Sequence, residues 1–172
     1  MKLNTRLAAA ALAALAVTGV GATSAMAATP VTKAANGKAV VQTSVLSADA
    51  AMKIADAASK EAVKRGQKVT IAIVDRSGVT RLVLKGDGSG PQTEESAKRK
   101  AFTAVSFGQA TSKLASNQAL AAIPGTLLLA GGVPVASGGA PIAGIGVGGA
   151  PSGDIDEAIA QAGLQAVQGQ LG

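Results

Sequence analysis

Residue types that commonly carry catalysis are scarce in this chain. The sequence contains no histidine, cysteine, tyrosine or tryptophan. Their absence excludes histidine-dependent triads, cysteine nucleophiles and zinc sites of the usual kind. Asp75 follows a β-branched run, where forming a turn is the default role of an aspartate. No acid, base or nucleophile accompanies it, so we predict no catalytic residue.

Acidic residues near the C-terminus offer a possible metal site. Asp154, Asp156 and Glu157 supply hard oxygen donors of the kind that suit a ferric ion. Asp154 and Glu157 are three residues apart, which puts them on one face of a helix. The same spacing also fits a capping box, with Asp154 as N-cap and Glu157 as its partner. Both interpretations stay open at this stage, and they are compatible.

Basic and aromatic residues are concentrated in one segment. Lys98, Arg99 and Lys100 are consecutive, so on a helix they lie about 100° apart and cannot all face one site. Phe102 and Phe107 are the two aromatic residues of the chain, and such residues more often belong to a core. The net charge of +6 suits small anionic ligands. It is too diffuse, with too few aromatic residues, to predict nucleic-acid binding.

The stretch from Ala130 to Glu157 organises the elements that must position these residues. Its β-branched residues flank Gly138-Gly139, a two-residue turn signal, and predict a hairpin whose second strand runs over 140–148. Glycine is dense in this strand, which marks a place where another backbone or a ligand comes close. We expect the contact to be with another subunit or with the ligand.

The remaining pattern predicts an α+β sandwich in which helices cover an antiparallel sheet. Ser47 is expected to cap a first helix that ends at Gly66, and Thr93 a second that ends near 105–107. Thr111 or Ser112 would cap a short helix through Ala122. Strands are expected at 39–41, 69–74, 79–85 and 126–129, and a last helix at 154–168.

The N-terminal residues resemble a secretory signal peptide. Lys2 and Arg6 precede an apolar run over 7–20, and Ala25-Met26-Ala27 is a small-x-small cleavage site. We therefore expect three parts: a signal peptide at 1–27, a flexible mature N-terminus at 28–45 and one domain at 46–172. The apolar run is short for a membrane span, and no lipobox cysteine is present. The expected location is secreted, periplasmic or in the cell envelope.

Four pieces of the sequence together resemble a known family. They are VTIAIVDRSGVTRLVLKGDG, SAKRKAFTAVSFGQATSKL, GGVPV and IAGIGVGGAPSGDIDEAIAQAGL, in this order. The same order is typical of the GlcG/HbpS family of haem-binding, or haem-degrading, domains, and the resemblance covers about 46–167. With the signal sequence, the chain is most similar to the exported, HbpS-like branch.

The resemblance implies a profilin-like three-layer α/β/α sandwich with a five-stranded antiparallel sheet. It also implies a homo-octamer that binds haem and, in some members, aquo-cobalamin or iron. A membrane sensor kinase is implied as a partner in sensing oxidative stress. Slow haem degradation would then be chemistry of the bound iron rather than of protein side chains.

The resemblance implies roles for Thr111 and the acidic residues, and the chemistry of haem adds further candidates. Thr111, in FGQAT, corresponds to a threonine haem ligand of exported members, and Thr126 is the second candidate. Lys98 and Lys100 could pair with haem propionates, and Phe102 and Phe107 could stack on the porphyrin. Asp154, Asp156 and Glu157 resemble the D/E-x-x-E iron motif. The alternatives are a helix cap for Thr111, a solvated face for the lysines and core packing for the phenylalanines.

Two competing functions remain open on the sequence. The lack of histidine leaves a poor ligand field for haem, which favours a module that binds cobalamin or another small ligand. The apolar, aromatic-poor composition would equally serve a structural or interaction protein. Haem binding, as a means to sequester or sense haem and iron, is the leading expectation.

Overall fold

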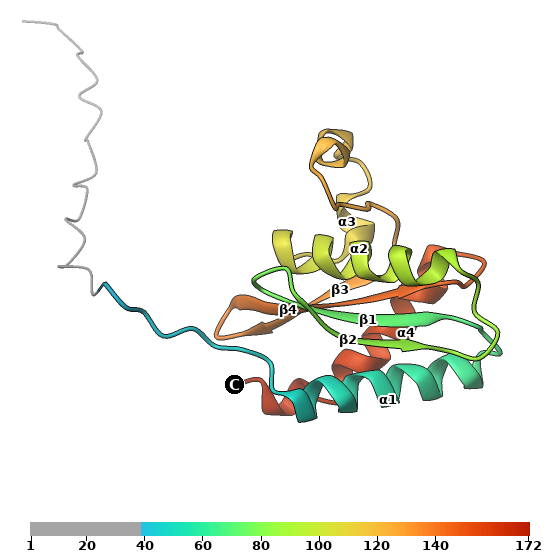
Figure 1. The fold of residues 1–172 in the computed structure, drawn as a ribbon, viewed down its shortest axis with the longest axis horizontal. Coiled ribbons are helices and arrows are strands. Elements are labelled where there is room, and N and C mark those ends of the chain that lie inside the picture. The colour runs from blue at the N-terminus through green and yellow to red at the C-terminus, as the bar shows by residue number, and fades with distance from the viewer. Residues whose placement is uncertain (1–38) are drawn as a thin grey trace, which may run out of the picture. The chain divides into compact units, whose positions relative to one another are not determined.

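The helices and strands follow one another in an α-β-β-α-α-β-β-α order. A computed structural model describes residues 39–172, drawn in colour in Figure 1. The elements are α1 (Ala48–Lys64), β1 (Thr70–Asp75), β2 (Thr80–Lys85), α2 (Gln92–Phe107), α3 (Thr111–Leu114), β3 (Gly132–Ser137), β4 (Ala140–Gly148) and α4 (Gly153–Gln165), with 3₁₀ helices η1 (Gln118–Ala122) and η2 (Gln168–Gln170). The expected signal peptide at 1–27 and most of the expected N-terminal segment lie outside the described residues.

The sheet has four strands in the order β2-β1-β4-β3, and every neighbouring pair is antiparallel. The five-stranded expectation is therefore wrong for the described residues. The expected strand at 126–129 does not form, because its backbone bonds to α2 instead. Arg99 Nη2 donates to the Thr126 carbonyl, and the Leu127 amide donates to Thr103 Oγ1. Residues 39–41 form no strand either.

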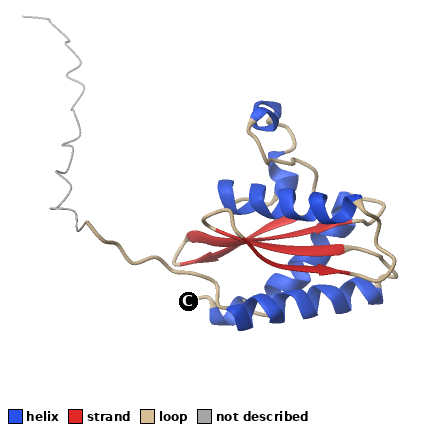
Figure 2. Cartoon of the chain, viewed as in Figure 1, coloured by secondary structure: helices blue, strands red, loops and turns tan. Residues whose placement is uncertain are grey.

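Helices cover both faces of the sheet, as the three-layer expectation required. Figure 2 shows α1 and α4 on one side and α2 on the other. The larger core lies between the sheet and the α1–α4 layer and includes Ile54, Ile73, Ile145 and Ile159, each fully buried. A smaller cluster joins Val74 of β1 to Ala101 and Val105 of α2. Alternate residues of β1 thus supply the two cores.

The two predicted hairpins are present. At the β1–β2 turn, Asp75 Oδ1 accepts hydrogen bonds from the Ser77 amide at 2.9 Å, the Ser77 hydroxyl at 2.6 Å and the Val79 amide at 3.1 Å. Between β3 and β4, Gly138 and Gly139 have φ values of 57° and 79°. Two successive positive φ values favour glycine, which has no side chain to clash, and this agrees with the glycine pair of the turn.

Helix capping confirms one prediction and corrects two. Ser47 caps α1 by accepting from the Ala50 amide. Thr93 does not cap α2, since it lies inside the first turn and donates its hydroxyl to the Gly90 carbonyl. Ser152, not Asp154, caps α4 by accepting from the Ile155 amide, so the capping box of Asp154 and Glu157 is wrong.

The glycines of β4 let α2 approach the sheet closely. A methyl group added at Gly144 or Gly146 would collide with the carbonyl oxygen of Ala101 or Ala97, respectively. At Gly148 an added methyl carbon would lie 2.9 Å from the Thr93 carbonyl oxygen. The predicted close approach is present, but the neighbour is a helix of the same chain rather than another subunit or a ligand.

Among residues 39–172, no helix is both long and apolar enough to cross a bilayer.

Candidate functional site

Thr111 lies where α2 ends and α3 begins. Gly108, with a φ of 63°, ends α2, and Ala110 is the residue before α3. Thr111 is fully buried, and its Oγ1 accepts a hydrogen bond of 2.9 Å from the Gly132 amide at the start of β3. The helix-cap alternative for Thr111 is wrong, because the side chain caps no amide of α3. It connects α3 to the sheet instead.

Glu157, on α4, forms hydrogen bonds next to the Thr111–Gly132 contact. Its carboxylate accepts from the Ser112 hydroxyl at 2.6 Å and from the Ser112 amide at 3.3 Å. It also accepts from the Gly131 amide at 3.3 Å. Glu157 therefore connects the residue after Thr111 to the residue before Gly132.

Lys100 and Asp156 form a buried ion pair between α2 and α4. The Lys100 ammonium lies 2.7 Å from Asp156 Oδ2, and both side chains are 4% exposed. Lys100 also donates to the Val147 carbonyl, and the Ala150 amide donates to Asp156 Oδ1. Burial raises the pKa of Asp156, against the opposing effects of Lys100 and the backbone amides. Lys100 is thus committed inside the protein and is not free for an anionic ligand.

The three acidic residues do not converge on one point. Asp154 is exposed, Asp156 is paired with Lys100, and Glu157 is bonded to Ser112 and Gly131. Asp154 and Asp156 both line a recess of about 400 Å³ at the first turns of α2 and α4, but Glu157 does not. In the described part of the chain, no three acidic residues are grouped to hold a metal ion.

The other residues singled out by sequence have local partners. Lys98 pairs with Glu94 at 2.5 Å on the surface of α2. Thr126 is buried, and its hydroxyl lies within hydrogen-bond distance of the Leu120 and Ile123 carbonyls. Phe102 is half-buried beside the smaller core, where its ring packs between Gly78 and Gly125. Phe107, at the end of α2, is half-buried.

An open groove lies beside α3. Its volume is about 340 Å³, and we call it the α3 groove. The lining residues are Gly108, Gln109, Ala110, Lys113, Val133, Pro134, Gln161 and Leu164. Ala110 and Lys113 flank Thr111 in the sequence, so the groove lies next to the predicted ligand. Val133, Pro134 and Leu164 make part of its wall apolar.

Lys113 is a groove residue that the sequence reasoning did not select. Its side chain is exposed, and within residues 39–172 it forms no ion pair. Its position in ATSKL, two residues after Thr111, was the available signal. An unpaired ammonium beside apolar residues suits a ligand that is apolar with an anionic end.

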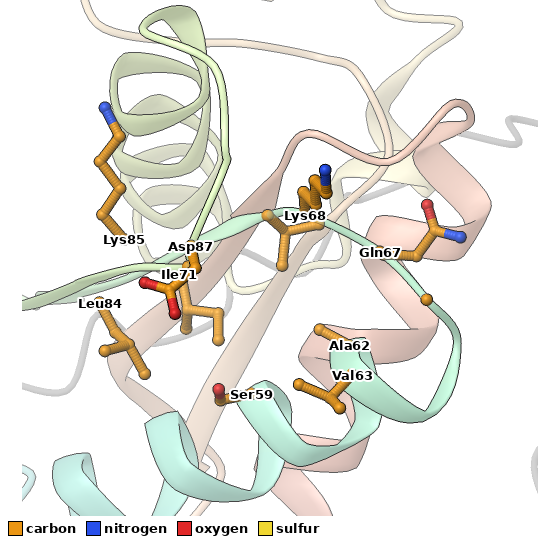
Figure 3. Close-up of a pocket in the computed structure, with 12 residues that line it drawn as sticks. Ser59, Ala62, Val63, Gln67, Lys68, Ile71, Leu84, Lys85 and Asp87 are labelled. Carbon is orange, nitrogen blue, oxygen red and sulfur yellow. The ribbon is translucent and has the colours of Figure 1, made fainter.

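A second cavity, of about 470 Å³, lies between the end of α1 and the β1–β2 hairpin (Figure 3). Ile71 and Leu84 are among its lining residues, with Lys68, Lys85 and Asp87 around them. None of the residues singled out by sequence lines this cavity, and none of its lining residues is a near neighbour of Thr111.

The α3 groove is the better candidate site because Ala110 and Lys113, close to Thr111 in the sequence, line it. In the recess at the first turns of α2 and α4, Lys100 and Asp156 are already paired with each other.

The family model and the solved structures that match this chain agree with each other. Residues 46–165 match the model of a family described as haem-degrading protein HbpS-like. The crystal structure of HbpS is 54% identical with a TM-score of 0.74, covering 78% of this chain and 98% of that one. A double mutant of Streptomyces reticuli HbpS is also 54% identical, with a TM-score of 0.73, covering 82% and 98%.

A further neighbour is a structure named PduOC:Heme complex. It is 25% identical with a TM-score of 0.65, and the match covers 72% of this chain and 95% of that chain. No curated protein sequence matches this chain. The family match spans most of the sequence and agrees with the α+β architecture and with the motifs around α2, β4 and α4. The chain therefore belongs to the HbpS-like haem-degrading protein family.

Proposed function

We propose that this protein binds haem in the α3 groove, with Thr111 as the iron ligand. The observation that carries the proposal is the position of the groove, whose wall includes Ala110, the residue before Thr111, and Lys113, two residues after it. Membership of the HbpS-like family supports haem as the ligand, and so does the similarity to a PduOC structure named as a haem complex.

The chemistry of the groove fits haem. Pro134 provides apolar surface for a porphyrin, with the largely buried Val133 and Leu164 behind it, and Lys113 provides a cation for a propionate. Thr111 contributes a hydroxyl oxygen, a hard and weak ligand that favours ferric iron. Lys98 and Lys100 are less suited to the propionates because each already pairs with a carboxylate.

Bound haem would supply the redox chemistry of its iron, including any slow degradation of the porphyrin. The protein would bind the group, orient it and limit its contact with water. This division of roles matches a sequence without histidine, cysteine or tyrosine.

The proposal extends to assembly and location. At about 340 Å³ the groove is at the small end of the range for ligand sites, so a second copy of the chain would complete it. We therefore propose a homo-oligomer, for which the family resemblance suggests an octamer. The signal-peptide pattern at 1–27 supports secretion, and a secreted haem binder would suit a sensor kinase that responds to oxidative stress.

A haemin titration followed in the Soret region tests the proposal. The wild-type protein should give a saturable, shifted band, and Thr111→Ala should weaken binding and alter the band. Thr80→Ala, at an exposed threonine of β2, is the matched control and should bind like wild type. A shifted band unaffected by Thr111→Ala would remove Thr111 as the ligand.

Two further arms of the titration test the propionate contact and the ligand. Lys113→Gln should weaken binding by roughly threefold to tenfold, as expected for loss of one charge-assisted contact at an exposed site. Lys68→Gln, an exposed lysine outside the groove, should have no effect. If haemin gives no saturable shift but aquo-cobalamin does, the cobalamin alternative replaces the haem proposal.

A further inference from the structure

Thr111 is closed to any ligand in this structure. The residue is fully buried, and its Oγ1 already accepts the Gly132 amide. An iron ion held in the α3 groove could reach this oxygen only if α3 moves away from β3. Access to Thr111 therefore depends on the contacts that hold α3 in place.

Those contacts are three hydrogen bonds and the burial of two side chains, Thr111 and Leu114. α3 has four residues, too short to be a stable helix without tertiary contacts. Thr111 is bonded to Gly132, and Ser112 is bonded through both its amide and its hydroxyl to Glu157. The Glu157 carboxylate also accepts the Gly131 amide, so one side chain holds both sides of the Thr111–Gly132 contact.

The Gly131 side of this contact is fixed independently. The Val147 amide donates to the Gly131 carbonyl, and a methyl group added at Gly131 would lie 2.8 Å from atoms of Lys100, Val147 and Asp156. Gly131 also has a φ of 124°, which other residues rarely adopt. Because β3 and α4 are held here, α3 is the part that can move.

We propose that Glu157 is a positioning residue that controls the access of iron to Thr111. Its carboxylate holds Ser112, and with it Thr111, in the closed placement. Loss of its charge reduces the free-energy difference between the open and the closed placement, because hydrogen bonds to a charged acceptor are roughly twice as strong as neutral ones and the closed placement would lose that strength. The apparent affinity for the ligand is the affinity of the open form multiplied by the fraction of molecules that are open. Weakening the hydrogen bonds of Glu157 raises that fraction and therefore favours binding. This inference rests on the proposed function of Thr111 as ligand.

Hydrogen exchange of the Gly132 amide, followed by NMR, tests the closed placement without haem. This amide is protected by Thr111 Oγ1. Glu157→Gln should speed its exchange about tenfold, while the Ile73 amide in the centre of β1 should be unchanged. Glu95→Gln makes the same chemical change at an exposed residue of α2 and should behave like wild type. Unchanged exchange at Gly132 would overturn the proposal.

Stopped-flow haemin binding tests the consequence for the ligand. Glu157→Gln should associate about tenfold faster than wild type, and the gain should disappear when Thr111→Ala is added. If Glu157→Gln does not fold, Ser112→Ala removes the shortest contact and should give a smaller acceleration of the same sign. Faster Gly132 exchange without faster haemin association would show that Glu157 does not control access. A wild-type protein without saturable haemin binding would instead remove the proposed function, whereas Gly132 exchange would still report on the closed placement.

Discussion

At the scale of single residues, the Lys100–Asp156 pair connects helices that cover opposite faces of the sheet. Lys100 comes from α2 and Asp156 from α4, and the pair also bonds the Val147 carbonyl and the Ala150 amide at the end of β4. A buried charge without its partner is costly, so the pair is expected to matter more for stability than any surface ion pair of the protein.

Replacing Lys100 alone should therefore be strongly destabilising. Lys100→Met leaves the Asp156 carboxylate buried without its cation and should lower the free energy of unfolding by about 3–5 kcal/mol. Urea unfolding measures this change. Lys98→Met removes an exposed pair with Glu94 and should cost no more than about 1 kcal/mol. The double variant Lys100→Met/Asp156→Leu should recover part of the loss, and equal losses in the two single lysine variants would contradict the argument.

Asp75 should contribute to the pH dependence of stability. The Ser77 hydroxyl, together with the Val79 and Ser77 amides, holds the pKa of the Asp75 carboxyl below its usual value. A carboxyl whose pKa is lowered in the folded state contributes stability above its unfolded pKa of about 3.9, and this contribution is lost as the pH falls through the folded pKa.

Asp75→Asn should remove that contribution. The variant should be less stable than wild type at neutral pH, and the difference should shrink on acidification below about pH 4, because the wild-type carboxyl is then protonated. Thermal unfolding between pH 7 and pH 2 measures both curves. A difference that stays constant over this range would show that Asp75 acts through geometry rather than charge.

At the scale of elements, β4 determines how closely α2 can pack. Three glycines, Gly144, Gly146 and Gly148, face the α2 backbone. Their pairing partners on β1 are Val74, Ala72 and Thr70, so the sheet under α2 consists of small or branched residues. This surface positions the end of α2, and with it Thr111 and the α3 groove.

Adding one methyl group to this surface should disturb α2. Gly146→Ala would meet the Ala97 carbonyl and the Ala101 amide, so overpacking should lower the free energy of unfolding by about 1–3 kcal/mol or more. Gly169→Ala is the control, because nothing lies within 4 Å of a methyl group there. Chemical denaturation compares the two, and equal stability would contradict the close approach of α2.

Some local signals predicted their elements correctly, although the caps expected at Thr93 and Asp154 were wrong. The two hairpins, the Ser47 cap and the Asp75 turn depend on neighbours in sequence, and all are present. The expected strand at 126–129 was wrong because its hydrogen-bond partners, Arg99 and Thr103, are more than twenty residues away. The Asp154 cap was wrong because α4 begins at Gly153, so Ser152 occupies the N-cap position and Asp154 lies in the first turn.

At the scale of the whole molecule, the family and the α+β architecture could be predicted from the sequence, but the site could not be assembled from it. Asp156 and Glu157 are adjacent in sequence, yet one bonds to Lys100 and the other to Ser112. Only the crossing of α4 with α2 and α3 decides these partners. The α3 groove likewise brings together the α2–α3 connection, α3, β3 and α4, so no local pattern in the sequence could define it.

A crystal structure of the full-length protein with haemin tests the central claim most directly. We predict a porphyrin against Val133, Pro134 and Leu164, with its iron bound to Thr111 Oγ1 and α3 moved away from Gly132. A haem bound elsewhere, or one whose iron is held by another group while Thr111 stays bonded to Gly132, would contradict the account.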